Sequence, residues 1–165
     1  MEQSNFRVLI LLLTIGSIIS IILSISGNHW IKVTNYTAGL WKKCEHGKEC
    51  IDLEQFWLPA VRVVMVTGLG LLCSAVLYYA AMVFKPRSFG SLCMSVFLGL
   101  ASACVLIGLS VYLYFDMDTF TNSFQYHWSF FMGWLSFVLA LIATTMSCYD
   151  ARKNVKPFEN AVRLE

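Results

Sequence analysis

The sequence is poor in charge. Only 13% of its 165 residues are Asp, Glu, Lys or Arg, and the formal net charge is +2. No run of basic residues is long enough to suggest a nucleic-acid-binding surface, so that class of protein is excluded. Hydrophobic residues make up 58% of the chain, which is too apolar for an ordinary globular domain that folds in water. The chain is therefore predicted to lie in a membrane.

Charged residues are absent from four long runs, Val8 to Ser26, Val63 to Phe84, Ser88 to Phe115 and Tyr126 to Tyr149. A helix needs about 20 apolar residues to cross a hydrocarbon core about 30 Å thick. We therefore expect an all-α membrane protein, a single domain over residues 1–165 with transmembrane helices at about 8–27, 59–84, 88–115 and 126–149. The loops would then be about 28–58 and 116–125, with a tail at 150–165. Without intramembrane charges, a proton-coupled transporter or a charge-lined ion path is not expected.

Two features that small four-span enzymes need are also missing. No Cys-x-x-Cys pair occurs, although vitamin K epoxide reductases depend on such a redox pair. The apolar runs contain no charged residues of the kind that glutathione-linked eicosanoid synthases would use to hold glutathione. With no convergent polar groups, we expect no catalytic residue, no cofactor and no enzymatic activity.

The polar segment between the first two runs is predicted to form a small sheet. Residues 29–36 alternate between apolar and polar side chains, and residues 38–44 can return after a turn. Cys44 and Cys50 are the only cysteines in this segment, and a disulfide between them would contribute about 2 kcal/mol by the chain-entropy estimate. A zinc site formed by Cys44, His46 and Cys50 is the alternative, but it lacks an obvious fourth ligand. No metal site is expected elsewhere.

The same segment carries the signals for membrane orientation. Asn35-Tyr36-Thr37 is an N-glycosylation sequon, and a disulfide requires an oxidising compartment. Basic residues gather on the opposite side, at Arg7, Lys85, Arg87, Arg152, Lys153, Lys156 and Arg163. We therefore expect both termini in the cytoplasm and the protein in the plasma membrane, with an intracellular vesicle or granule membrane as the alternative. Residues 1–27 could instead be a signal peptide that is cleaved. The first loop would then still lie on the same side of the membrane.

Four further side chains have two readings each. Arg62 is either a lipid-headgroup anchor or a hydrogen-bond donor to carbonyl groups of the first loop. His127 is either an interfacial polar residue or a pH sensor. Cys93 and Cys148 are either S-palmitoylation sites near the cytoplasmic face or inert packing residues.

Several of these residues form a pattern that resembles the claudin superfamily, which includes the peripheral myelin protein, epithelial membrane protein and lens fibre membrane protein branches. The pattern comprises Trp30, Gly39-Leu40-Trp41, Cys44, Cys50 and Arg62 within four spans. Trp128-Ser129-Phe130 and Gly133-Trp134 are similar to the start of the last helix in the short members. The resemblance implies a left-handed four-helix bundle with a small extracellular β-sheet, with Trp41 at the top of the bundle and a Cys44–Cys50 bond inside the sheet.

The resemblance also implies a function without chemistry, in cell–cell adhesion, junction formation or membrane organisation through the disulfide-bonded loop. The alternative is an auxiliary subunit or trafficking regulator of a channel or secretory vesicle protein. Expected partners are the lipid bilayer and other membrane proteins, including a second copy in cis or in trans. The loop is shorter than in true claudins, the cysteines are closer together, and the chain ends in Leu164-Glu165 rather than a hydrophobic residue. Paracellular pore formation and PDZ scaffold binding are therefore not expected.

Overall fold

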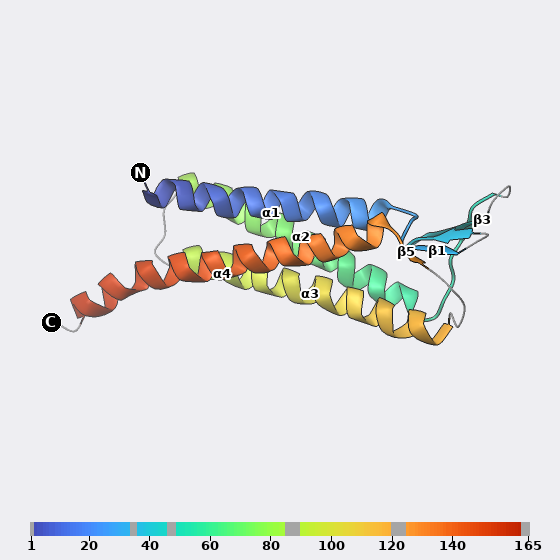
Figure 1. Cartoon of the computed structure of the whole chain (residues 1–165). Coiled ribbons are helices and arrows are strands. Elements are labelled where there is room, and N and C mark those ends of the chain that lie inside the picture. Colours follow the sequence, from blue (N-terminus) through green and yellow to red (C-terminus); the bar gives the residue numbers. More distant parts are fainter. Residues whose placement is uncertain (1, 34–35, 46–48, 85–89, 120–124, 163–165) are drawn as a thin grey trace.

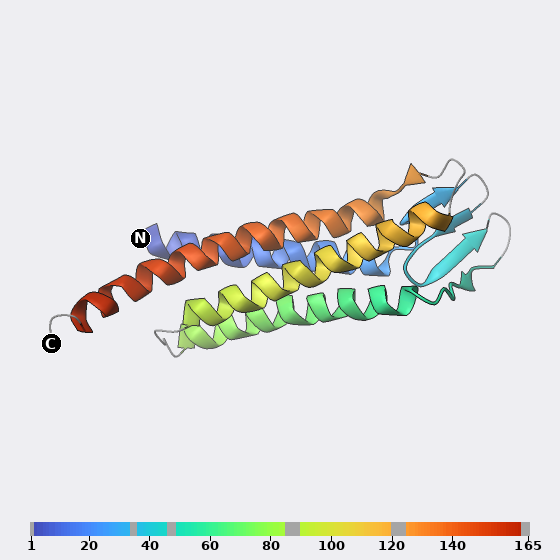
Figure 2. The same ribbon diagram turned by 90° about the horizontal axis from the view of Figure 1, so that it is seen from below.

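The computed structural model describes residues 2–33, 36–45, 49–84, 90–119 and 125–162. It contains four long helices, α1 (Glu2–Ser26), α2 (Leu58–Phe84), α3 (Gly90–Thr119) and α4 (Trp128–Val162). The helices run side by side, and a small sheet covers one end of the bundle (Figure 1). We call this end the sheet end. A view rotated by 90° shows that α1 begins and α4 ends at the opposite end (Figure 2).

All four helices are long and apolar enough to cross a membrane, which confirms the four predicted spans. The qualifying segments are Asn5–Ser26, Leu58–Ala81, Leu92–Phe115 and Trp128–Lys153. The helices differ from the predicted ranges chiefly at their polar ends: α1 starts at Glu2, α3 continues to Thr119, and α4 continues to Val162 through much of the expected tail. Hydropathy detects the part of a helix that matches the hydrocarbon layer, whereas backbone hydrogen bonding continues into water.

The sheet has five short antiparallel strands, one more than the first loop alone provides. They are β1 (Ile31–Val33), β2 (Tyr36–Ala38), β3 (Lys42–Glu45), β4 (Ile51–Asp52) and β5 (Gln125–Tyr126), in the order β4-β3-β2-β1-β5. The fifth strand comes from the connection between α3 and α4 and pairs with β1, placing Ile31 opposite Tyr126. Within the range 116–125, which was expected to be a loop, residues 116–119 belong to α3 and Gln125 begins this strand.

The helices pack through small side chains where they approach closely. In the α1–α4 pair, Ser17 Oγ donates to Ser136 O at 2.9 Å and Ser136 Oγ donates to Ser17 O at 3.0 Å. At Gly133 a side chain would be crowded, because an added Cβ would lie 2.9 Å from Leu109 Cδ2 of α3 and 3.0 Å from Ser24 Oγ of α1. Large apolar residues such as Leu12, Leu77 and Val96 remain exposed on outward faces, as expected for helices that contact lipid.

An aromatic cluster joins the sheet to the bundle. Trp30, directly before β1, is fully buried, and its ring centroid lies 4.6 Å from that of Tyr112 on α3 and 5.8 Å from that of Phe130 on α4. Trp57, directly before α2, contacts Tyr112 from another side, with centroids 5.5 Å apart. Aromatic pairs of this kind contribute about 0.5–1.5 kcal/mol each beyond their burial. Trp30 therefore holds the start of β1 against α3 and α4.

Candidate functional site

The candidate site is the sheet together with the residues that fix it to the bundle, and its first anchor is a pair of indole groups. The last four carbonyl groups of a helix have no partner within that helix. At the end of α1, Trp30 Nε1 donates to Ser24 O at 2.7 Å, and Trp41 Nε1 donates to Ile25 O at 2.9 Å. Each tryptophan thus satisfies one of two consecutive carbonyl groups. Trp30 lies buried, whereas Trp41 is 39% exposed at the top of the bundle, where the resemblance places it.

The glycine of Gly39-Leu40-Trp41 is required by a close approach of two backbone segments. A Cβ at Gly39 would lie 2.7 Å from Gly27 O and 2.9 Å from the carbonyl carbon of Asn28. Both atoms belong to the backbone that links α1 to β1, so neither can move as the end of a flexible side chain can. The missing side chain lets the turn after β2 rest directly on this link, which brings Trp41 within reach of Ile25.

Arg62 is the second anchor, and the structure decides between its two readings. It extends from the first turns of α2, where its Nε donates to Leu40 O at 2.8 Å and one terminal nitrogen donates to Leu53 O at 2.7 Å. Its Cζ also lies 5.0 Å from the centroid of the Trp41 ring. Arg62 therefore binds both the beginning and the end of the β3–β4 hairpin to α2, as a donor to loop carbonyl groups.

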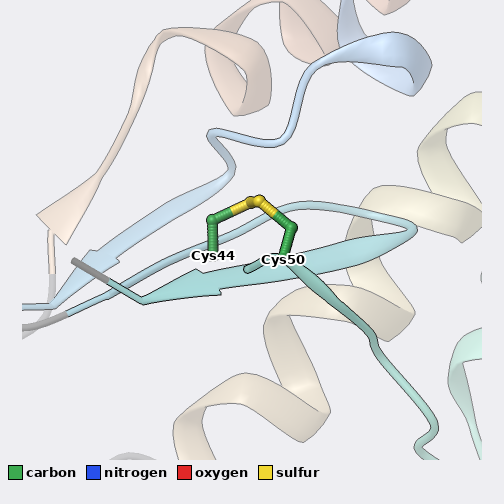
Figure 3. Close-up of a disulfide and its surroundings, with 2 residues drawn as sticks. All are labelled: Cys44 and Cys50. Atoms are coloured by element: carbon green, nitrogen blue, oxygen red, sulfur yellow. A yellow bond between two sulfur atoms is a disulfide. The ribbon is translucent and has the colours of Figure 1, made fainter. Parts of the chain in front are cut away.

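A disulfide between Cys44 and Cys50 joins β3 to the residue that precedes β4 (Figure 3). The two Cα atoms are 4.2 Å apart. The bond uses two of the three groups considered for a zinc site, so that alternative is wrong for this oxidised form; His46 lies outside the described residues. The hairpin is consequently closed at both ends, by the disulfide and by Arg62.

Between the sheet and the bundle lies a partly open pocket of about 240 Å³. Trp57 and Tyr112 line it from the bundle, and Ile31 and Lys43 line it from the sheet. The ammonium group of Lys43 is already engaged, because Nζ lies 3.4 Å from Glu45 Oε1 and 4.0 Å from the centroid of the Tyr36 ring. Apolar and aromatic side chains thus make up most of the lining, together with the paired Lys43 and the amide of Gln55.

Comparison with known proteins identifies the chain. The profile of the PMP-22/EMP/MP20/Claudin family matches residues 6–147. The chain belongs to this family. Claudin domain-containing protein 2 from Mus musculus is 29% identical over 139 residues, which cover 80% of this chain and 78% of that protein. Claudin domain-containing protein 2 from Homo sapiens is 27% identical over 139 residues, covering 81% of this chain and 79% of that protein. The resemblance drawn from the sequence motif is thus confirmed.

The remaining predicted residues of this claudin-family chain are Asn35, Cys93, Cys148 and His127. Asn35 lies outside the described residues. Cys93 and Cys148 are exposed on α3 and α4, away from the sheet. His127 lies at the sheet end and contacts His29, with ring centroids 5.5 Å apart. Nothing in the local sequence predicts this contact, because the pairing of β1 with β5 that creates it joins segments distant in the chain.

Proposed function

We propose that this claudin-family protein acts without catalysis in cell–cell adhesion, junction formation or membrane organisation. In this proposal the five-stranded sheet is the binding element. Binding partners are other membrane proteins, including a second copy in the same or an apposed membrane. The anchoring of the sheet to the bundle supports the proposal, because a surface that is ordered before binding loses less conformational entropy when a partner docks.

One observation carries the proposal: an exposed apolar residue on the rigid edge of the sheet. Ile51 on β4, directly after Cys50, is 59% exposed, and β4 is the outermost strand at that side. The disulfide and Arg62 hold this strand in place from both ends. Sheet edges present unpaired backbone groups that other chains can bind, and the short β4 limits this pairing to a small contact.

The proposal also sets the orientation of the protein. Both termini lie in the cytoplasm, the sheet end lies outside the cell, and Asn35 carries N-linked glycan in the plasma membrane. Glycosidase treatment of native protein and of Asn35→Gln tests this directly. A mobility shift in the native chain alone agrees with the orientation, whereas protease digestion of the sheet from the cytoplasmic side contradicts it.

The experiment for the binding role is crosslinking and affinity capture from intact cells. Native chain is compared with Cys44→Ser/Cys50→Ser and with Ile51→Glu, each matched for surface level. Glu54→Gln is the control, because Glu54 is exposed between β4 and α2. We expect the neighbours captured by the native chain to be lost in both test variants and kept in the control. Neighbours that persist in both test variants would place recognition in the membrane helices instead.

Capture of the same neighbours by both test variants would favour the second candidate function. In that function the protein is an auxiliary subunit or trafficking regulator of a channel or vesicle protein. The observation in its favour is the extent of exposed apolar surface on the helices, including Leu77, Val96 and Val138. Lipid covers such surface by default, and another membrane protein can replace it. Co-purification of a channel or vesicle protein with native chain and with Ile51→Glu alike is the expected result for this function.

We also propose Cys93 and Cys148 as S-palmitoylation sites. Both thiols are exposed, with Cys93 in the first turn of α3 and Cys148 in the second half of α4. The start of α3 and the end of α4 lie at the end of the bundle opposite the sheet (Figure 2). A palmitate-exchange assay should label the native chain and should not label the variant Cys93→Ser/Cys148→Ser. That variant keeps the exposed thiol of Cys73, which serves as the internal control. No labelling of the native chain would refute the assignment.

A further inference from the structure

The partly open pocket between the sheet and the bundle lies apart from the exposed residue of β4 on which the proposed binding role rests. Its volume is about 240 Å³. We propose that this pocket receives a tyrosine side chain from an extracellular segment of a partner membrane protein. The inference rests on the proposed function, because it names the chemistry by which such a partner is recognised.

The size of the pocket limits what it can hold. A water molecule occupies about 30 Å³ of the liquid, so the pocket has room for about eight atoms of that size. A tyrosine side chain, from Cβ to the hydroxyl, has about that many non-hydrogen atoms. Pockets for drug-sized ligands start at about 300 Å³. The volume therefore suits a single side chain better than a lipid or a larger organic molecule.

Two aromatic rings form a corner in the wall of the pocket. Trp57 and Tyr112 both line it, and their ring centroids lie 5.5 Å apart with 79° between the ring planes. Phe115 stacks on Trp57, with centroids 5.4 Å apart and 8° between planes, and so holds that ring in place. A further ring in the corner can stack on one wall and meet the other edge to face, the arrangements that aromatic pairs favour. The wall therefore favours a flat aromatic occupant.

Two polar side chains in the lining, Lys43 and Gln55, determine which aromatic group fits best. The Lys43 ammonium has three N–H donors. Its contacts with Glu45 Oε1 at 3.4 Å and with the ring of Tyr36 at 4.0 Å engage two of them, which leaves one for a ligand. The Gln55 amide can donate and accept, and so can a phenol hydroxyl. A phenylalanine ring would displace water from these groups without replacing its hydrogen bonds.

The charges at the pocket favour a neutral occupant. The carboxylate of Glu45 already faces the ammonium of Lys43. An anionic ligand would have to displace that carboxylate or lie beside a like charge, and a cationic ligand would be repelled by Lys43. A phenol, which is neutral at physiological pH, avoids both costs.

The walls of the pocket are ordered by contacts that do not involve a ligand. Ile31 and Ala38 line the pocket from the sheet and lie opposite each other in the β1–β2 register. Leu53, a third lining residue, accepts a hydrogen bond from Arg62 at 2.7 Å through its carbonyl group. A pocket that is ordered in advance loses less conformational entropy when a side chain enters it.

Exposed apolar surface continues from the pocket along the chain. Phe56 lies between the lining residues Gln55 and Trp57, and its side chain is 88% exposed. In protein interfaces, a side chain that fills a pocket is surrounded by contacts that exclude water. The backbone of the segment that carries the tyrosine would cover Phe56 and thereby supply such contacts.

The first test measures binding of N-acetyl-tyrosinamide to the full chain in lipid nanodiscs. NMR follows the methyl signals of Ile31, which lines the pocket, and of Ile51, which is exposed on β4. The variants Ile31→Val and Ile51→Val assign the two signals. The Ile31 signal should shift and saturate, and the Ile51 signal should stay in place. N-acetyl-phenylalaninamide should bind at least about threefold more weakly, since it lacks the hydroxyl that forms the hydrogen bonds. An Ile31 signal that does not move, or equal affinity for the two amides, would overturn the proposal.

Paired variants test the two polar side chains. Lys43→Met removes the ammonium in the pocket, and its control is Lys42→Met, at the exposed neighbouring position on β3. Gln55→Leu removes the amide, and its control is Glu54→Gln, at the exposed position before it. Each test variant should bind N-acetyl-tyrosinamide at least about threefold more weakly than its control. Affinity that is unchanged in both test variants would refute the roles given to Lys43 and Gln55, and with them the preference for tyrosine.

A third experiment identifies the occupant in intact cells. A photo-crosslinking amino acid is placed at position 56, beside the pocket. A crosslink to another membrane protein that is lost when one tyrosine of the crosslinked segment is changed to phenylalanine supports the proposal. Crosslinks to lipid or to a second copy of this chain alone would overturn it. The proposed function itself fails on a different result, the persistence of captured neighbours in both Ile51→Glu and Cys44→Ser/Cys50→Ser.

Discussion

The guanidinium of Arg62 lies over the indole ring of Trp41, with 5.0 Å between Cζ and the ring centroid. The same side chain donates to the carbonyl of Leu40, the residue before Trp41, and to that of Leu53 beyond the hairpin. Trp41 in turn donates to the last turn of α1. Arg62 and Trp41 thus connect α2, the hairpin and α1 through one continuous set of contacts.

Replacing Arg62 with lysine should destabilise the protein. A lysine ammonium can remain near the Trp41 ring, but its single nitrogen cannot reproduce the fork that reaches two carbonyl groups. We expect the free energy of unfolding to fall by about 1–3 kcal/mol, the usual cost of leaving part-buried acceptors unsatisfied. Thermal unfolding in detergent micelles measures the effect. Arg152→Lys, at an exposed position on α4, is the matched control, and an equal change in both variants would contradict the role given to Arg62.

The two indole donors should differ in importance when each tryptophan is replaced by phenylalanine. Trp30→Phe removes a donor from Ser24 O in a buried place, and water cannot readily replace it. Trp41→Phe removes the donor to Ile25 O at a place where the side chain is partly exposed. A water molecule can therefore replace the lost donor there. We expect a loss of about 1–3 kcal/mol for Trp30→Phe and a smaller loss for Trp41→Phe. Chemical denaturation of both variants side by side provides the comparison; the reverse order would show that this difference in burial is not decisive.

Gly39→Ala should destabilise the protein, whereas Gly70→Ala should not. The new Cβ at position 39 would meet backbone atoms at 2.7 and 2.9 Å, and at position 70 it would meet nothing within 4 Å. Overpacking of this kind costs about 1–3 kcal/mol, while an alanine within α2 favours helix formation by about 0.5–1 kcal/mol. The ratio of folded to aggregated protein on size-exclusion chromatography, with unfolding temperature, gives the readout. Similar behaviour of the two variants would disprove the close approach at Gly39.

Reductant should lower the unfolding temperature of the native chain and leave that of Cys44→Ser/Cys50→Ser unchanged. The disulfide closes a short loop, for which the chain-entropy estimate is about 2 kcal/mol. Cys73→Ser, which removes a free thiol on α2, is the control and should respond to reductant as the native chain does. A reductant effect of the same size in the double variant would mean that the stabilisation comes from elsewhere.

The sequence predicted well what depends on local composition and on the family motif. Hydropathy located the four spans because each span must match the hydrocarbon layer by itself. The resemblance to the family motif indicated Trp30, Trp41 and the disulfide, and the structure places all three at the sheet end. Arg62 remained ambiguous, since its role depends on where the carbonyl groups of Leu40 and Leu53 lie in space. That information is set by tertiary structure and is not visible in the residue itself.

The sequence could not predict the features that depend on distant pairing. Gln125–Tyr126 is too short to show a strand pattern, and it becomes a strand only because β1 offers an unpaired edge beside the start of α4. The contact between His29 and His127 follows from the same pairing. The continuation of α4 to Val162 was missed for another reason, because a change from apolar to charged residues marks where a helix leaves the membrane, not where it ends.

The strand order has a consequence for the synthesis of the protein. During translation β1 to β4 emerge early, whereas β5 emerges only after α3 has been made, so the outer edge of β1 stays unpaired until the connection between α3 and α4 has been synthesised. An open strand edge on a partly synthesised chain is a site for aggregation or chaperone binding. Completion of the sheet therefore requires a chain that has been synthesised past α3, and a chain truncated before β5 would leave the edge of β1 unpaired.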